Sequence, residues 1–237
     1  MTEPAKQIVA SRPLREQVAD IIRGMILRGE LGPGEQLSER AIGQMLQVST
    51  TPVKEALRTL QAEGLIYTKP RSGSYVADIS IDDMLKIAFM RSSLEGVAAY
   101  YASAALTEAQ LDQMRQLLDA VEPLLPDYRT HQEEIHQHNV AFHNVIRQAA
   151  GNSYLTNQIE TLRTIDYSFR RIAQMSYIEE PLPAHREHRE ILSALEGRQA
   201  DRSEALMVAH IRRVAVYVAD CAKALRAKKA LDKSEGT

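Results

Sequence analysis

The feature that most constrains the fold is a long stretch, residues 79–226, with helical periodicity and almost no strand pattern. Within it, about six segments carry apolar residues at helical spacing, and proline, glycine or polar residues separate them. Short connections between helices favour antiparallel neighbours. The sequence therefore predicts a mainly α protein in which residues 79–226 form an all-α antiparallel bundle of about six helices.

Residues 11–78 have a different pattern. An amphipathic segment, "LREQVADIIRGMILRGEL", is broken at "GPGEQL", and "SERAIGQMLQ" begins a second helix with Ser38 as its N-cap. "TPVKEALRTLQAEG" predicts a third helix, with Thr51 as N-cap, Pro52 in the first turn and Gly64 at the end. "LIYTKPRSGSYVADI" predicts two short strands around a tight tip. Three helices followed by a β-hairpin predict a winged helix-turn-helix domain.

The third helix is the candidate DNA-reading element. We expect it to pack on the second helix through apolar side chains, namely Ile42, Leu46, Val53, Leu57 and Leu60. Its N-terminal end then faces outward, as recognition helices do in the major groove. The candidate DNA-binding residues of this helix, its surroundings and the wing are Arg40, Ser49, Thr50, Thr51, Lys54, Arg58, Lys69 and Arg71. The alternative is that the basic residues only form a solvated face.

Charge is distributed in a way that is compatible with nucleic-acid binding. Residues 1–77 carry 10 basic and 8 acidic residues, whereas the remainder carries 19 and 23. Within residues 40–71 five basic residues face two acidic ones, which is a weak basic patch. We expect residues 1–10 to form a flexible arm and residues 227–237 a polar tail.

Several classes of protein are excluded by composition. No apolar run reaches the roughly 18 residues that span a bilayer, and the N-terminus lacks a basic-then-apolar signal pattern. Cys221 is the single cysteine, so an intramolecular disulfide cannot form. These features predict a cytoplasmic protein without a membrane partner.

The stretch "LGPGEQLSERAIGQMLQVSTTPVKEALRTLQAEGLIYTKPRSGSYVA" closely resembles the DNA-binding domain of the GntR family of bacterial transcription regulators. The helical remainder resembles the FCD-type effector domain of the FadR subfamily, through "MRSSLEGVAA", "FHNVIRQAAGN" and "EHREILSALEGRQADRSEALMVAH". The resemblance covers nearly the whole chain and places DNA contacts at Arg40, Thr50, Thr51, Lys54 and the wing around Pro70–Arg71. Thr50 and Lys54 stand where this family usually has arginine, so the operator of better-known relatives cannot be carried over.

The resemblance also implies a divalent metal site, at Asn139, His143, His188 and His210. In the FCD pattern an aspartate and three histidines from three helices bind the ion, and Asn139 here replaces the aspartate. The spacing of His188 and His210 relative to neighbouring apolar residues predicts that both point into the bundle. Three inward histidines suit zinc or nickel, although each could instead be a satisfied core residue. With a neutral amide at 139, either the affinity falls or the ion depends on an anionic effector.

The bundle contains further candidate residues outside the metal site. Arg91 lies on the same helix face as apolar residues and therefore needs an anionic partner. That partner is either Glu95 or another bundle acid, or it is an effector carboxylate, as the family's "R..LE" arginine implies. We expect His136, His138 and His185 at the surface or rim and His131 in a loop. The sequence does not place Arg163 and Arg170.

These observations favour a ligand-responsive transcription regulator, which is not an enzyme. A homodimer would bind a pseudo-palindromic double-stranded operator, and a small organic acid in the bundle would change its affinity. Most regulators of this kind are repressors. Two alternatives stay open: a metal-dependent enzyme built on the three histidines, for which no general base is evident, and a DNA-binding protein whose bundle only dimerises.

Overall fold

The computed structural model describes residues 12–78, 80–172 and 181–235. The chain divides into two compact units, of which one holds the chain up to Ser80 and the other holds most of the chain from Ile81 onwards. The expected N-terminal arm, residues 1–10, lies outside the described residues. Each unit is described by itself below.

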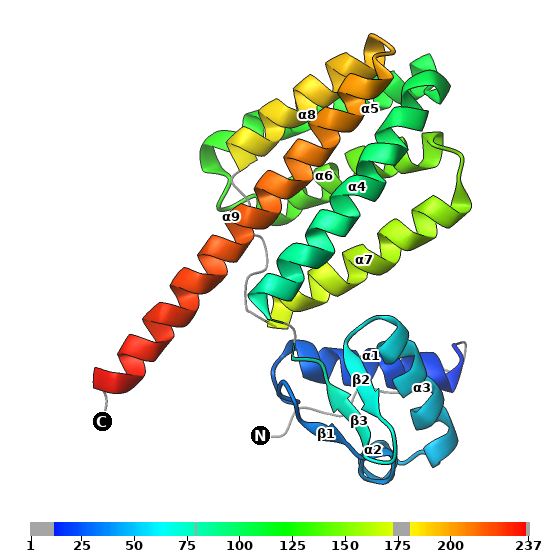
Figure 1. The fold of residues 1–237 in the computed structure, drawn as a ribbon, viewed down its shortest axis with the longest axis vertical. Helices are drawn as coiled ribbons and strands as arrows, with labels where there is room; N and C mark the ends of the chain where they lie inside the picture. The colour runs from blue at the N-terminus through cyan, green and yellow to red at the C-terminus, as the bar shows by residue number, and fades with distance from the viewer. Residues whose placement is uncertain (1–11, 79, 173–180, 236–237) are drawn as a thin grey trace. The chain divides into compact units, whose positions relative to one another are not determined.

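The first unit contains three helices and a small sheet (Figure 1). The helices are α1 (Leu14–Leu27), α2 (Glu39–Leu46) and α3 (Thr50–Ala62), and the strands are β1 (Gln36–Leu37), β2 (Ile66–Lys69) and β3 (Gly73–Val76). The strands pair antiparallel in the order β1-β3-β2. This confirms the winged helix-turn-helix fold and adds β1, a two-residue strand that is too short to leave a periodic pattern.

Local signals account for the ends of α2 and α3. Ser38 caps α2 by accepting a hydrogen bond from the Ala41 N–H at 3.3 Å, as expected. The backbone N–H of Gly64 bonds back to α3, and Gly64 adopts a φ of +70°, which a glycine tolerates without strain. Thr51 is not the N-cap of α3, because the helix already begins at Thr50 and Ser49 is the cap residue. Proline is tolerated anywhere in the first turn, where its missing N–H would have no partner, so Pro52 does not fix the first residue.

The tight turn between α2 and α3 depends on a close backbone approach. A Cβ atom added to Gly43 of α2 would lie 2.9 Å from the backbone oxygen of Val48. Only glycine avoids this contact, so the sequence at this position sets how closely the two helices approach. Apolar side chains from all three helices and the sheet then form one core, which includes Val18, Ile22, Ile26, Leu37, Ile42, Val53, Leu57, Leu60, Ile66 and Val76.

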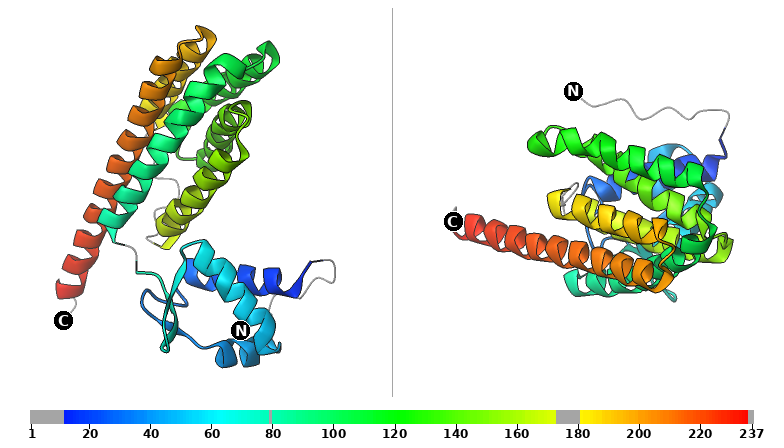
Figure 2. Two further views of the ribbon diagram at one scale, coloured as in Figure 1. Left: turned by 45° about the vertical axis from the view of Figure 1, so that its right-hand side comes forward. Right: turned by 90° about the horizontal axis from the view of Figure 1, so that it is seen from above.

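The second unit is a helical bundle, and its six described α-helices confirm the predicted architecture. They are α4 (Ile81–Ala105), α5 (Glu108–Val121), α6 (Gln132–Ala149), α7 (Ser153–Ile172), α8 (Pro181–Glu196) and α9 (Ala200–Glu235), with a 3₁₀ helix, η1 (Glu122–Asp127), after α5. Helices α4 and α9 lie side by side in every view (Figures 1 and 2). The core between the helices includes Met114, Leu118, Phe142, Ile146, Ile191, Leu195 and Met207.

The segment expected as a polar tail, from residue 227, is part of helix α9 up to Glu235. Helix α9 continues to Glu235 and is 36 residues long, or about 54 Å at the usual rise per residue. The reason is local, since this segment is rich in strong helix formers and the next glycine is Gly236. Among the described residues, no helix is both long and apolar enough to cross a bilayer.

Candidate functional site

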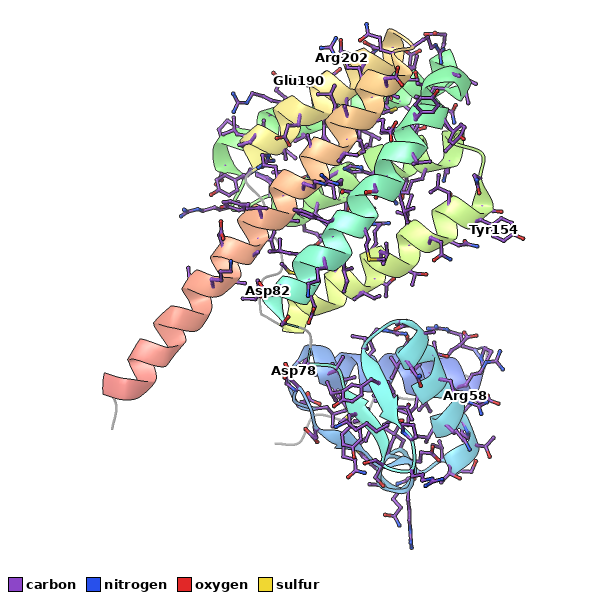
Figure 3. The ribbon with its side chains drawn as sticks, in the orientation of Figure 1. Arg58, Asp78, Asp82, Tyr154, Glu190 and Arg202 are labelled. Atoms are coloured by element: carbon purple, nitrogen blue, oxygen red, sulfur yellow. The ribbon has the colours of Figure 1, made fainter. Side chains whose placement is uncertain are left out.

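The candidate DNA-binding residues share one property in the structure: their side chains are exposed. This holds for Arg40 of α2, for Ser49 before α3, for Thr50, Thr51, Lys54 and Arg58 of α3, and for Lys69 and Arg71 of the wing. Arg58, labelled in Figure 3, extends from the surface of the first unit. The apolar side of α3, with Val53, Leu57 and Leu60, is buried instead. Helix α3 thus presents a polar face that is free to meet a partner.

Electrostatics distinguish this face from the α1 side of the same unit. Near α1, two arginines pair with neighbouring acids, Arg12 with Asp20 at 3.0 Å and Arg23 with Glu63 at 2.6 Å, whereas Arg15 is exposed and makes no ion pair within the described part of the chain. None of the basic members of the candidate set makes an ion pair among the described residues; they are Arg40, Lys54, Arg58, Lys69 and Arg71. Exposed cations without an internal counter-ion are available to phosphate groups.

The wing holds one of these cations in a defined place. Tyr67 and Tyr75 stack across β2 and β3 with their ring centroids 5.6 Å apart. The Lys69 ammonium lies 5.0 Å from the Tyr75 ring centroid and 5.5 Å from that of Tyr67, within the range of a cation–π interaction. At the tip Arg71 adopts a φ of +62° in a three-residue loop between Lys69 and Gly73. The wing is therefore an ordered hairpin with a basic tip.

In the second unit, His143, His188 and His210 come together from α6, α8 and α9, and all three are buried. The Nε2 atom of His188 lies 3.1 Å from Nε2 of His143 and 3.1 Å from Nε2 of His210. One nitrogen of a neutral imidazole has either one hydrogen or one lone pair, so His188 cannot make two well-aligned hydrogen bonds at once. The cluster is therefore not satisfied by hydrogen bonding within itself.

The donor set fits a borderline divalent cation. Nitrogens about 2.1 Å from a common ion lie about 3.0 Å apart at an octahedral angle and about 3.4 Å apart at a tetrahedral one. The two 3.1 Å contacts of His188 fall within this range, and the ligand nitrogens of all three histidines lie within 4.8 Å of one another. A cation would accept all three Nε2 lone pairs, which no arrangement of protons can do. Zinc and nickel are ions that imidazole ligands suit.

The surroundings of His143 and His188 favour the neutral imidazole, the form that binds metal. Burial holds the pKa of His143 well below its usual range, and the nearby charges of His188, His210, Arg147 and Arg91 lower it further. Burial likewise holds the pKa of His188 well below its usual range. For Glu187, beside His210, burial raises the pKa, but hydrogen bonds from His210 and Arg213 outweigh this and lower it, so the carboxylate stays charged.

Asn139 lies one turn before His143 on α6 and is half-buried. Its spacing puts it on the same helix face as His143. The amide carries no charge, so the four residues predicted as ligands supply nitrogen and oxygen donors but no anion.

Of the partners expected for Arg91, the structure selects another bundle acid and not Glu95. Arg91 is buried, and its Nη2 donates to Asp166 Oδ2 at 3.3 Å, so its partner is an acid of α7 rather than Glu95. Glu95 is fully buried and instead accepts a hydrogen bond from Arg147 Nε at 3.2 Å. One polar atom of each remains without a hydrogen-bond partner among the described residues, namely Arg91 Nε and Glu95 Oε1. Periodicity alone could not choose between these pairs, because each joins different helices.

The other histidines of this unit and two further arginines are also candidate residues. His185 is buried, at 8% exposure, rather than on the surface, because α8 packs it against its neighbours. His136 and His138 are half-buried, and His131 precedes the first residue of α6. Arg163 pairs with Glu160 on its own helix at 2.7 Å. The side chain of Arg170 lies outside the described residues.

Comparisons with known families agree with this architecture. The family model described as "Bacterial regulatory proteins, gntR family" matches residues 14–76, and the model of the FCD domain matches residues 86–213. The chain therefore belongs to the gntR family of bacterial regulatory proteins and carries an FCD domain.

Individual relatives cover nearly the same length. The chain is 30% identical to the HTH-type transcriptional repressor RspR of Escherichia coli (strain K12) over 215 residues, which are 90% of this chain and 92% of RspR. It is 28% identical to the HTH-type transcriptional regulator LutR of Bacillus subtilis (strain 168), covering 80% of this chain and 94% of LutR. The solved structure of E. coli McbR/YncC has the same fold, with a TM-score of 0.61, 21% identity and coverage of 87% of this chain and 97% of that one.

Membership of this family decides between a transcription regulator and a metal-dependent enzyme. The protein is a transcription regulator of the gntR type and not a metal-dependent enzyme. The three histidines then lie in a regulatory rather than a catalytic domain.

Proposed function

We propose that this regulator binds a pseudo-palindromic operator as a homodimer, acts as a repressor in the cytoplasm, and is controlled by a small organic acid bound in the FCD domain. The observation that carries the DNA-binding part is the contrast in charge pairing within the first unit. The basic residues of α3 and the wing are exposed and unpaired within the described residues, whereas Arg12 and Arg23 near α1 are neutralised. The name of RspR, a transcriptional repressor, supports the sign of the response.

For the bundle, we propose a divalent ion, zinc or nickel, held by His143, His188 and His210 with Asn139 beside them. The effector's carboxylate would complete the ion's coordination and approach Arg91, whose Nε has no partner within the described structure. A neutral residue at 139 favours this arrangement, because the ion then lacks an anionic protein ligand. An effector that binds two states of the dimer with different affinity shifts the DNA-binding equilibrium by that difference.

Fluorescence anisotropy with a labelled duplex from the region upstream of the protein's own gene tests the DNA-binding proposal. Affinity is expected to fall steeply with salt, because phosphate contacts release counterions. Arg40→Ala should weaken binding, whereas Arg202→Ala on α9, which is exposed and far along the chain in the other unit (Figure 3), serves as a control with no expected effect. A DNA affinity that does not change with salt concentration would contradict the assignment. So would an Arg40→Ala variant that binds DNA as tightly as the Arg202→Ala control.

A second experiment separates effector control from a bundle that only dimerises. Light scattering should give twice the chain's mass, and elemental analysis should give about one divalent ion per chain, lost in a His143→Ala/His188→Ala variant. The anisotropy assay is then repeated with a panel of small mono- and dicarboxylates. A carboxylate that changes the DNA affinity of the wild type but not of Arg91→Gln supports the proposal. A dimer that binds DNA equally with and without every acid and metal would favour the purely dimerising bundle.

A further inference from the structure

Glu187 lies directly before His188 on α8, yet its side chain contacts α9. His210 Nδ1 donates a hydrogen bond to Glu187 Oε2 at 2.7 Å. Arg213, three residues after His210, donates to the same carboxylate through Nη2 at 2.9 Å and through Nε. The Glu187 side chain is 27% exposed, so these bonds form at the edge of the buried cluster. Glu187 thus links the histidine cluster to an ion pair at the border of the bundle.

This contact makes His210 different from the other two histidines. The Nδ1 atoms of His143 and His188 are buried and have no hydrogen-bond partner among the described residues. His210, in contrast, has its Nδ1 hydrogen placed by Glu187, which leaves the Nε2 lone pair directed at Nε2 of His188. One ligand of the cluster is therefore held in the metal-binding tautomer before any ion arrives.

The balance of charge around the cluster also indicates a role for Glu187 in metal binding. Three neutral imidazoles and the Asn139 amide leave both positive charges of a divalent ion unbalanced by protein ligands, and Arg91 and Arg147 add positive charge close to His143. Glu187 is a carboxylate that hydrogen-bonds directly to one of the three histidines. A carboxylate behind a metal-bound histidine fixes its orientation and raises its basicity.

We propose that Glu187 is a positioning residue for the metal: it holds His210 in the binding tautomer and supplies, from behind the ligand, negative charge that the ligands themselves lack. Arg213 in turn fixes the carboxylate through two hydrogen bonds. The inference rests on the metal site of the proposed function and adds to it the residue on which the ion's affinity depends.

If Glu187 had only a structural role, its replacement would affect the stability of the bundle and not the metal affinity. Glu196 provides a matched control, because it also lies on α8, is similarly exposed at 34%, and accepts a hydrogen bond from an arginine of another helix, Arg115, at 2.6 Å. Glu196→Gln therefore repeats the same chemical change in the same helix without touching a histidine.

The test measures zinc affinity of the full chain by competition with a chromophoric chelator, after removal of resident metal. Glu187→Gln should bind Zn²⁺ about 10- to 100-fold more weakly than the wild type, whereas Glu196→Gln should bind it equally well. Far-UV circular dichroism confirms that both variants are folded. Equal affinities for Glu187→Gln and Glu196→Gln would overturn the inference while leaving the metal site intact. A wild type that binds no Zn²⁺ would instead overturn the metal site itself.

A second measurement needs no metal. Long-range ¹H–¹⁵N correlation spectra of the metal-free protein report which ring nitrogen carries the hydrogen. His210 of the wild type and of Glu196→Gln should be protonated at Nδ1, and Glu187→Ala should convert His210 to a mixture of tautomers. A wild-type His210 protonated at Nε2, or a tautomer that is unaffected by Glu187→Ala, would refute the positioning role.

Discussion

The buried ion pair between Glu95 of α4 and Arg147 of α6 offers a sharp test of the forces that hold the bundle together. Glu95 is fully buried and the Arg147 side chain is 3% exposed. Burial lowers the pKa of Arg147, and the Glu95 charge acts in the opposite direction. Glu95→Gln removes that charge and leaves a buried guanidinium short of its partner.

The expected loss follows from the remaining contacts of Arg147. Removing one member of a buried ion pair costs about 3–5 kcal/mol. Arg147 keeps hydrogen bonds to Glu160 at 2.8 Å and to Asn144 Oδ1 at 2.7 Å, but the Glu160 side chain is 46% exposed and screened by solvent and the Asn144 amide is neutral, so together they offset only a small part. We therefore expect a loss of about 3 kcal/mol in the free energy of unfolding, or a Tm lower by roughly 6–12 °C for a unit of this size.

Calorimetry and far-UV circular dichroism of the metal-free full chain measure the effect. Glu196→Gln again serves as the control, with an expected loss below about 1 kcal/mol because its ion pair is exposed. The double variant Glu95→Met/Arg147→Met should be less destabilised than the sum of the two single variants, since neither charge is then left alone. A Glu95→Gln variant as stable as Glu196→Gln, or strictly additive single variants, would refute the reasoning.

Three further outcomes are expected. The metal-free bundle should lose stability as the pH falls below about 6.5, because His143 and His188 stay neutral when folded but are protonated when unfolded; each contributes a slope of up to about 1.4 kcal/mol per pH unit. Thermal melts between pH 5 and 8 check this, and a flat profile would contradict it. Gly43→Ala should weaken DNA binding and lower the Tm of the first unit, since the new Cβ would meet the Val48 oxygen at 2.9 Å; an unchanged melt would show that the turn adjusts freely. Lys54→Ala should reduce the slope of log affinity against log salt by about 1.8 for a dimer, and an unchanged slope would remove Lys54 from the phosphate contacts.

The sequence by itself determined the elements whose causes are local. The Ser38 cap, the Gly64 stop and the tight tip before Gly73 act over a few residues, and the structure has a helix or turn at each of them. Helical spacing also predicted that His188 and His210 face the bundle interior, because one face of a helix is fixed by its own periodicity.

Tertiary structure alone decided which buried groups meet. Arg91 pairs with Asp166, 75 residues away, and Arg147 pairs with Glu95 across 52 residues, although Glu95 lies one turn from Arg91. Strand β1 exists only because β3 lies beside it to supply hydrogen bonds. The contact of Glu187 with His210 likewise depends on how α8 and α9 pack. Side-chain partners across helices are set by the crossing and rotation of whole elements, and no pattern within one helix carries that information.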